Sequence, residues 1–272
     1  MKILISPAKK LDFSSEKTFL DNSTCVFSEK SKIIMKELSS YSALQLSKLM
    51  KISSNLGILN KERNDNWRFP FPENESKQAL LSFKGEVYQN MKIDKFDKSD
   101  SEFANDRLRI LSGLYGILKP SDLILPYRLE MGTKLKIGDN SNLYDFWREF
   151  VTGHLLNEIK KDKFLVNLAS DEYFKVINKK QIPIAIVTPI FKDVKNGKAK
   201  VISFYAKRAR GEMCNYIIKN KISTINHLSS FSENGYLFSK ENSTKEKLIF
   251  THQILQLRQA YKIVSNMISS KN

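Results

Sequence analysis

Hydroxyl, lysine and carboxylate side chains follow directly after two stretches that are typical of buried strands. Lys2–Ile5 leads into Ser6–Lys9, and Phe164–Leu168 leads into Ala169 and then Ser170–Glu172. In α/β sheets, ligands bind where strands end and helices begin. The same residues also have ordinary roles, because Ser170 or Asp171 could cap a helix and Ser6–Lys9 could form a simple turn. Both alternatives stand beside the ligand-binding one.

Together these side-chain types could carry out acid–base or nucleophilic chemistry on a nucleotide or a nucleic acid. That chemistry requires them to meet in one cleft, which spacing along the chain leaves open. The candidate cleft residues are Ser6, Lys9, Asp122, Arg128, Glu130, Ser170, Asp171, Glu172 and Lys207. A structural alternative is that Arg128, Glu130 and their neighbours form a buried ion-pair network. We name no catalytic residue and favour a role that is not enzymatic.

The stretch 107–132 predicts a second kind of site. Apolar residues at positions 104, 108 and 111 have helical spacing, and the pattern breaks at the glycine pair of Gly113-Leu-Tyr-Gly116. A helix, this turn and a second short helix look like a helix-hairpin-helix, whose glycines let backbone N–H groups approach a DNA phosphate. The alternative is a plain link between two packed helices. Pro120 leaves little room for a second helix, unless the proline itself opens that helix.

A basic cluster opens the helix predicted after residue 205. A cation at a helix N-terminus interacts unfavourably with the helix dipole, at a cost of about 0.3–1 kcal/mol. The placement of several cations there suggests that an anion binds to them. We therefore expect a basic cleft that holds DNA phosphates. The expected DNA-binding residues are Arg107, Arg109, Gly113, Tyr115, Gly116, Lys119, Lys207, Arg208 and Arg210.

The overall charge favours a polyanion as the partner. The 272 residues carry a formal net charge of +16 and an isoelectric point near 9.6, which attract nucleic acid first and anionic membranes second. Lysine outnumbers arginine by 36 to 9. Part of the charge could therefore be a compositional bias that is scattered over the surface.

Other compositional features narrow the class of protein. The two cysteines and three histidines have neither disulfide nor metal-ligand spacing, so we expect no metal and no cofactor. The longest apolar runs are too short for a membrane span, and the N-terminus lacks the pattern of a signal peptide. These features fit a cytoplasmic protein.

Strand-like and helix-like stretches alternate along the chain. The pattern predicts a mixed α/β (α+β) fold, with one domain, a mixed sheet, surrounding helices and the helix-hairpin-helix-like element. Asn196-Gly197 predicts a β-hairpin. Ser42, followed three residues later by Gln45, predicts a capping box at the start of a helix.

Five blocks, in this order, resemble the bacterial YaaA family of peroxide stress resistance proteins. The likeness extends to about Phe250, so we expect one YaaA-like domain over residues 1–250 and a helical extension over residues 251–272. The blocks are Ile5-Ser-Pro-Ala-Lys9, Phe83-Lys-Gly-Glu-Val-Tyr88, the stretch from Leu111 to Gly132, Asn167-Leu-Ala-Ser-Asp-Glu-Tyr173 and Ser203-Phe-Tyr-Ala-Lys-Arg-Ala-Arg-Gly211.

The resemblance implies a cytosolic protein of the oxidative-stress response, linked to lowered free iron and to reduced DNA damage by hydrogen peroxide. It also implies a positively charged cleft, a helix-hairpin-helix and binding of duplex DNA. We accordingly expect double-stranded or branched DNA as the partner, with weak sequence specificity, and no membrane partner. The oligomeric state stays open, a monomer included. The resemblance brings no catalytic activity with it.

Overall fold

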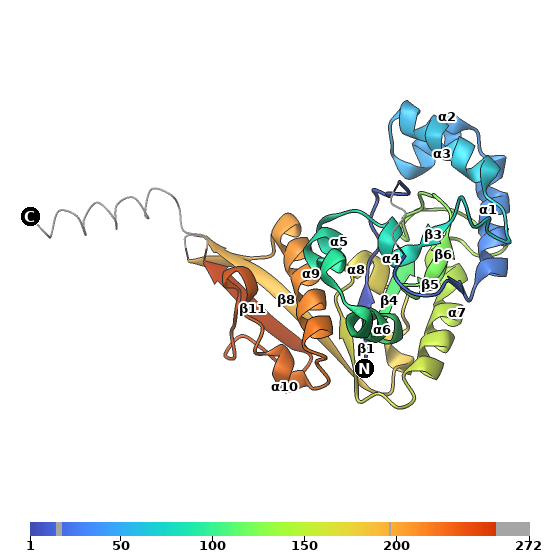
Figure 1. The fold of residues 1–272 in the computed structure, drawn as a ribbon. Helices are drawn as coiled ribbons and strands as arrows, with labels where there is room; N and C mark the ends of the chain where they lie inside the picture. The colour runs from blue at the N-terminus through green and yellow to red at the C-terminus, as the bar shows by residue number, and fades with distance from the viewer. Residues whose placement is uncertain (15–17, 196, 254–272) are drawn as a thin grey trace, which may run out of the picture.

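The computed structural model describes residues 1–14, 18–195 and 197–253. Its main sheet has a core of five parallel strands in the order β11-β8-β7-β1-β4 (Figure 1). Every residue of the neighbouring strands β1 and β7 is buried, so both faces of the sheet are covered there, as is typical of a parallel sheet enclosed by helices. The five strands are β1 (Lys2–Ile5), β4 (Leu108–Ser112), β7 (Phe164–Asn167), β8 (Ala185–Lys195) and β11 (Lys247–Gln253).

Antiparallel pairs complete the main sheet and confirm that it is mixed. β5 (Gly116–Leu118) pairs with β4, β10 (Leu237–Phe238) with β11, and β9 (Lys198–Lys200) with β8. The β8–β9 pair confirms the hairpin predicted around Asn196-Gly197. A smaller sheet has three strands in the order β2-β6-β3, which are β2 (Ser23–Thr24), β6 (Asp122–Ile124) and β3 (Lys77–Gln78).

Helices surround the main sheet, and α2 and α3 project from one end of the molecule (Figure 1). The capping box predicted at Ser42 and Gln45 is confirmed at the start of α2. The helices are α1 (Ser28–Ser40), α2 (Ala43–Met50), α3 (Ser54–Asn66), α4 (Ala79–Ser82), α5 (Glu86–Met91), α6 (Lys98–Arg107), α7 (Leu143–Glu158), α8 (Asp171–Phe174), α9 (Ser203–Lys219) and α10 (Ile225–Leu228), with short 3₁₀ turns at Ile93–Lys95, Lys179–Gln181 and Glu233–Gly235. Within the described part of the chain, no helix combines the length and apolarity that a membrane span requires.

The helix-hairpin-helix prediction is wrong. Helix α6 ends at Arg107, and the next residues form β4, whose Leu108 and Ile110 pair with β1. The chain then turns back as β5, so that Ser112 faces Gly116 across an antiparallel pair. All five residues of β4 are buried. Pairing with the N-terminal strand β1 therefore overrides the local helical spacing of the apolar residues.

The two glycines of this turn serve close packing. A Cβ atom on Gly113 would lie 2.4 Å from the backbone oxygen of Leu129, and Gly116 has a φ of +71° and lies against the ring of Trp147. Tyr115 between them is fully buried, and its hydroxyl accepts a hydrogen bond from the Trp67 indole N–H at 3.0 Å. This segment is thus an interior part of the fold.

Arg109 is also an interior residue. Its guanidinium makes a two-pronged ion pair with Glu158 of α7, with Nε and Nη2 between 2.6 and 3.0 Å from the two carboxylate oxygens. Only 3% of Arg109 is exposed. The ion pair therefore fixes α7 against the sheet from inside the protein.

The same ion pair makes stability depend on pH. Burial alone would raise the pKa of Glu158, but hydrogen bonds from His154 and Arg109 outweigh it and lower that pKa from 4.5 to about 2. Because the folded-state pKa is depressed, the stabilisation is complete above about pH 4.5 and is lost as the pH falls towards 2. We expect a loss of about 3 kcal/mol over this range. Urea denaturation at a series of pH values measures it, and Glu158→Gln should remove most of this component; an unchanged slope would contradict the prediction.

The domain boundary that was expected at residue 250 falls within strand β11. β11 continues to Gln253, so the described structure crosses the expected boundary at residue 250 without interruption. The predicted helical extension otherwise falls on residues 254–272, outside the described residues.

Candidate functional site

The main sheet has a topological switch point between β1 and β7. The two strands are neighbours and parallel, so their carboxyl ends meet at the same edge. From β1 the chain continues to β4 on one side, whereas from β7 it continues to β8 on the other. Loops that leave adjacent strands in opposite directions open a crevice, and such crevices are where open α/β sheets bind ligands.

The two loops at this point contact each other through serines. The Ser6 hydroxyl accepts a hydrogen bond from the Ser170 N–H at 2.9 Å and donates one to the Ser170 hydroxyl at 3.2 Å. Ser170 occupies the position before α8, but its side chain makes no capping hydrogen bond. The Tyr88 hydroxyl donates to the Ser6 carbonyl at 3.0 Å. Ser6 and Ser170 therefore meet, which the sequence had left open, and the capping alternative for Ser170 is not realised.

A cavity of about 660 Å³, hereafter the cleft, lies over these serines. Its size is in the range of small-molecule sites. Six cationic and four acidic side chains line it, so positive charge is in excess. The cationic ones are Lys9, Lys10, Lys84, Arg128, Lys207 and Arg210, and the acidic ones are Glu86, Glu130, Asp171 and Glu172.

Ion pairs hold part of this lining in place. Glu130 binds Lys9 at 2.8 Å and lies 3.6 Å from a terminal nitrogen of Arg128. The Gly132 N–H donates to the Glu172 carboxylate at 3.0 Å. The Nε atom of Arg128 is buried and has no hydrogen-bond partner among the described residues. Arg128, Glu130 and Lys9 are therefore ion-paired, as the structural alternative suggested, but the network is partly exposed and not buried.

Helix α9 supplies the cations on the other side. Lys207 and Arg210 are three residues apart and both line the cleft. The helix begins at Ser203, so these cations lie after its first turn and not, as the sequence had suggested, at its N-terminus. Burial lowers the pKa of Arg210, and the negative charge of Asp171 partly offsets this. Desolvated guanidinium groups favour an anionic partner, so this side of the cleft is suited to a phosphate or carboxylate.

Several expected residues lie elsewhere. Arg107, Arg109 and Lys119 are at the amino-terminal end of β4, whereas the cleft is at the carboxyl end of the neighbouring β1. Asp122 is buried and accepts a hydrogen bond from the Ser23 hydroxyl at 2.7 Å. Arg208 is exposed beside the cleft, 4.0 Å from Glu86. Gly113, Tyr115 and Gly116 are buried in the fold.

Residues 84–88 contribute to the site in a way that was not predicted from the sequence. This segment places Lys84, Glu86 and Tyr88 along the cleft, and Lys10 lies there as well. A signal was present, since Gly85 interrupts the helical pattern, and in the structure Gly85 lies against Ala8. The described residues contain no group of three or more His, Cys, Asp or Glu side chains placed to bind a metal ion together.

Comparison with known proteins identifies the relatives of this chain. Residues 1–242 match the family model described as peroxide stress protein YaaA. A UPF0246 protein of Clostridium botulinum (strain Eklund 17B / Type B) is 46% identical over 256 residues, which cover 92% of this chain and 99% of the relative. A UPF0246 protein of Flavobacterium psychrophilum is 47% identical over 255 residues, 92% and 100% of the two chains. One from Aliivibrio fischeri (strain MJ11) is 44% identical over 255 residues, 93% and 98%.

Proposed function

Because the chain belongs to the YaaA family of peroxide stress proteins, we propose that it limits peroxide damage by binding DNA. The cleft at the carboxyl ends of β1 and β7 holds phosphate groups of double-stranded or branched DNA. Contacts to phosphates position a protein on DNA without reading bases, so sequence specificity is weak. The buried Gly113–Gly116 turn has no part in this proposal.

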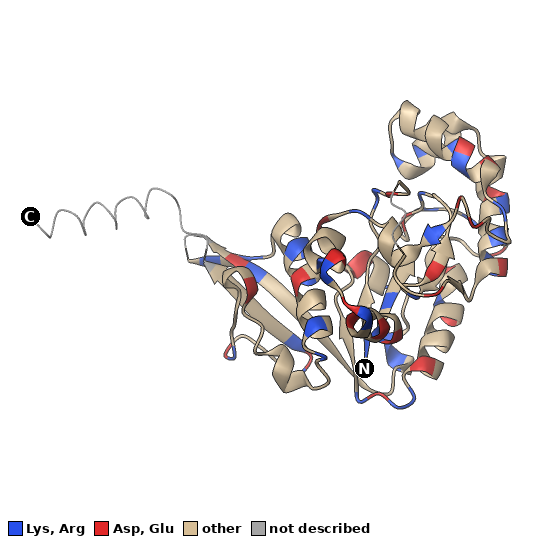
Figure 2. Cartoon of the chain, in the orientation of Figure 1, with Lys and Arg blue, Asp and Glu red and all other residues tan. Residues whose placement is uncertain are grey.

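The observation that supports the proposal is the excess of cationic side chains around the cleft. Lys207 and Arg210 face the loops after β1 and β7 within one cavity. The formal net charge of +16 adds a general attraction for polyanions. Figure 2 shows Lys and Arg interspersed with Asp and Glu over most elements, so the cleft, rather than one continuous basic stripe, is the feature to test.

A mobility-shift assay over a series of salt concentrations tests the proposal. The double variant Lys207→Ala/Arg210→Ala should weaken duplex binding by about tenfold and reduce the slope of log affinity against log salt by about 2. The matched control is Arg107→Ala/Lys119→Ala, which removes the same charge at the opposite end of the strands and should change affinity little. Equal losses from the two double variants, or an affinity that does not depend on salt, would contradict a role for the cleft.

A second candidate is an enzyme that acts on a nucleotide or nucleic acid in the same cleft. The specific observation in its favour is the Ser6–Ser170 pair, enclosed with Lys9, Arg128, Asp171 and Lys207. Hydroxyls beside cations and a carboxylate suit acid–base or nucleophilic chemistry. Product formation from nucleotides or DNA that stops in Ser6→Ala, while DNA affinity is retained, would establish this candidate in place of simple binding.

The link to lowered iron belongs to the same proposal as an indirect effect of the protein. Metal analysis of purified protein tests it. Iron bound tightly and in stoichiometric amount would contradict an indirect effect.

A further inference from the structure

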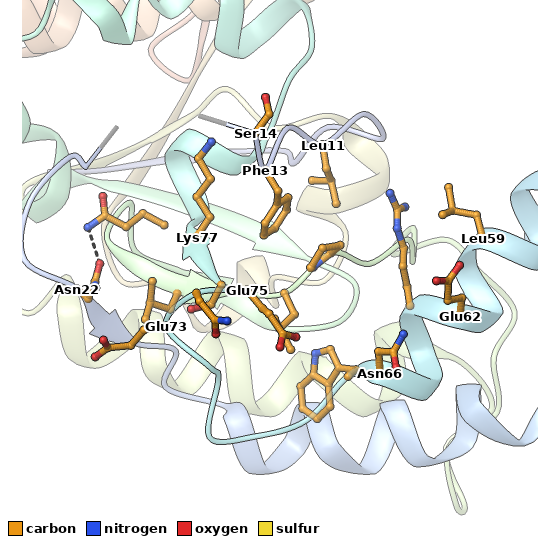
Figure 3. Close-up of a pocket in the computed structure, with 18 of the residues that line it drawn as sticks. Leu11, Phe13, Ser14, Asn22, Leu59, Glu62, Asn66, Glu73, Glu75 and Lys77 are labelled. Atoms are coloured by element: carbon orange, nitrogen blue, oxygen red, sulfur yellow. Dashed lines mark hydrogen bonds between the residues drawn. The ribbon is translucent and has the colours of Figure 1, made fainter. Parts of the chain in front are cut away.

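A second cavity, of about 830 Å³, lies between α3 and the loops that flank β3 and β6. Figure 3 shows Leu59, Glu62 and Asn66 extending from α3 on one side, with Leu11 and Phe13 on a facing segment. The cavity adjoins the cleft, but the two have no lining residue in common. Lys10 and Tyr127 line the cleft, whereas their sequence neighbours Leu11 and Pro126 line this cavity.

One wall of the cavity suits a flat ring. Trp67 is fixed at both ends, because its indole N–H donates to the Tyr115 hydroxyl at 3.0 Å and its ring packs edge to face on Phe71, with 5.7 Å between centroids. Leu125 and Pro126 line the same cavity. Rigid aromatic and apolar groups bind planar rings at little cost in conformational entropy.

Arg63 supplies a positive group with spare hydrogen-bonding capacity. Its hydrogen bond within the described part of the chain is a long one, 3.4 Å to the Asn60 side-chain oxygen. Burial, and then the positive charge of Arg128, lower the pKa of Arg63.

The acidic residues of the cavity do not cancel this preference. Glu75 is ion-paired with Arg68, whose side chain is exposed. Glu62 and Glu73 are exposed and therefore hydrated. Lys77 adds a second positive charge, and its ammonium group donates to the Asp12 carbonyl at 3.0 Å. The charges on the lining that are shielded from water are thus positive ones, on Arg63 and Lys77.

We propose that this second cavity binds a nucleoside monophosphate, with the phosphate on Arg63 and the base against Trp67. A guanidinium holds a phosphate through two parallel hydrogen bonds, and a nucleobase offers the flat face that Trp67 and Pro126 accommodate. The site is independent of DNA binding in the cleft, because it uses neither Lys207 nor Arg210.

Tryptophan fluorescence reports on the site directly. The chain has two tryptophans, and Trp147 is completely buried in the core. Titration with AMP, GMP, CMP and UMP, without DNA, should give a saturable change with at least one of them, and Trp67→Phe should abolish it. Adenosine or guanosine and inorganic phosphate, tested alone, should each bind more weakly than the matching monophosphate.

Arginine variants separate this site from general charge effects. Arg63→Gln should weaken monophosphate binding by about tenfold or more, whereas Arg107→Gln, which removes an arginine outside the cavity lining, should not. Circular dichroism confirms that each variant is folded, and Arg63→Lys should retain part of the affinity. The proposal is overturned by a flat titration at millimolar concentrations, by equal effects of the two glutamine variants, or by a nucleoside that binds as tightly as its monophosphate. Lys207→Ala/Arg210→Ala, tested in parallel, should bind the monophosphate normally, so failure here and failure of DNA binding are distinguishable.

Discussion

Replacing Arg109 with alanine is expected to lower the free energy of unfolding by about 3–5 kcal/mol. The change leaves Glu158 charged and only 13% exposed, without the guanidinium that binds both of its oxygens. It also removes the donor for the carbonyls of Asn105 and Leu108. Equilibrium denaturation with urea measures the loss.

Arg107 is the matched control, because it is two residues away and was assigned the same role in the sequence analysis. Its side chain is 34% exposed and pairs with Asp106 and Asp162. Ion pairs of this exposure contribute about 1 kcal/mol or less, so Arg107→Ala should cost much less than Arg109→Ala. If Arg109→Ala instead leaves stability unchanged and lowers DNA affinity, the interior role described above is wrong and the original DNA-binding assignment is restored.

The two strand ends beside the cleft are the part of the site that the sequence locates well. Ser6 and Ser170 each follow an apolar run that is bounded by polar residues, and both runs are strands. Parallel strands bring their carboxyl ends to one edge, so two loops 164 residues apart could be expected to meet. The shared cleft position of Lys207 and Arg210 agrees with their helical spacing, although α9 begins at Ser203 and its first turn carries no cation.

Residues 107–118 show what a local pattern leaves undetermined. Leu108-Arg-Ile-Leu-Ser has apolar spacing that suits a helix, yet the strand forms because β1 lies beside it. Gly113 is required by its approach to Leu129, sixteen residues further along the chain. Arg109 is buried because Glu158 is present on a helix 49 residues away. Each of these partners is distant in sequence. From their residue types alone, the arginine and the glycine were therefore interpreted as surface residues that contact DNA.

Asp122 was misplaced for a related reason. This residue was expected in the cleft because its side chain is polar. Its carboxylate instead lies in the small sheet, where it accepts hydrogen bonds from the Ser23 hydroxyl and the Lys119 N–H. Burial raises the pKa of this carboxyl, and the hydrogen bond from Ser23 partly offsets that rise. A single aspartate therefore carries no information about its site until the strand that holds it has been placed.

Gly211→Ala is expected to destabilise the protein and to weaken DNA binding at the same time. In an isolated helix the substitution would stabilise by about 1 kcal/mol. In α9, however, the added Cβ would lie 2.1 Å from the backbone oxygen of Val87 on α5. Figure 1 shows the two helices side by side, and Val87 lines the cleft. Overpacking typically costs about 1–3 kcal/mol, so the expected change has the opposite sign to the helix propensity.

Gly153→Ala in α7 isolates the propensity effect, because a Cβ there meets no atom within 4 Å. It should raise the free energy of unfolding by about 1 kcal/mol and leave DNA affinity unchanged.

For Gly211→Ala, separation of α9 from α5 moves Lys207 and Arg210 away from the loops after β1 and β7, so mobility shifts should weaken under conditions where the variant is still folded. A stabilised Gly211→Ala protein would show that the contact between α5 and α9 is looser than described. A destabilised but fully binding variant would show that DNA affinity does not depend on the position of α9, and the cleft proposal would then lose its structural basis.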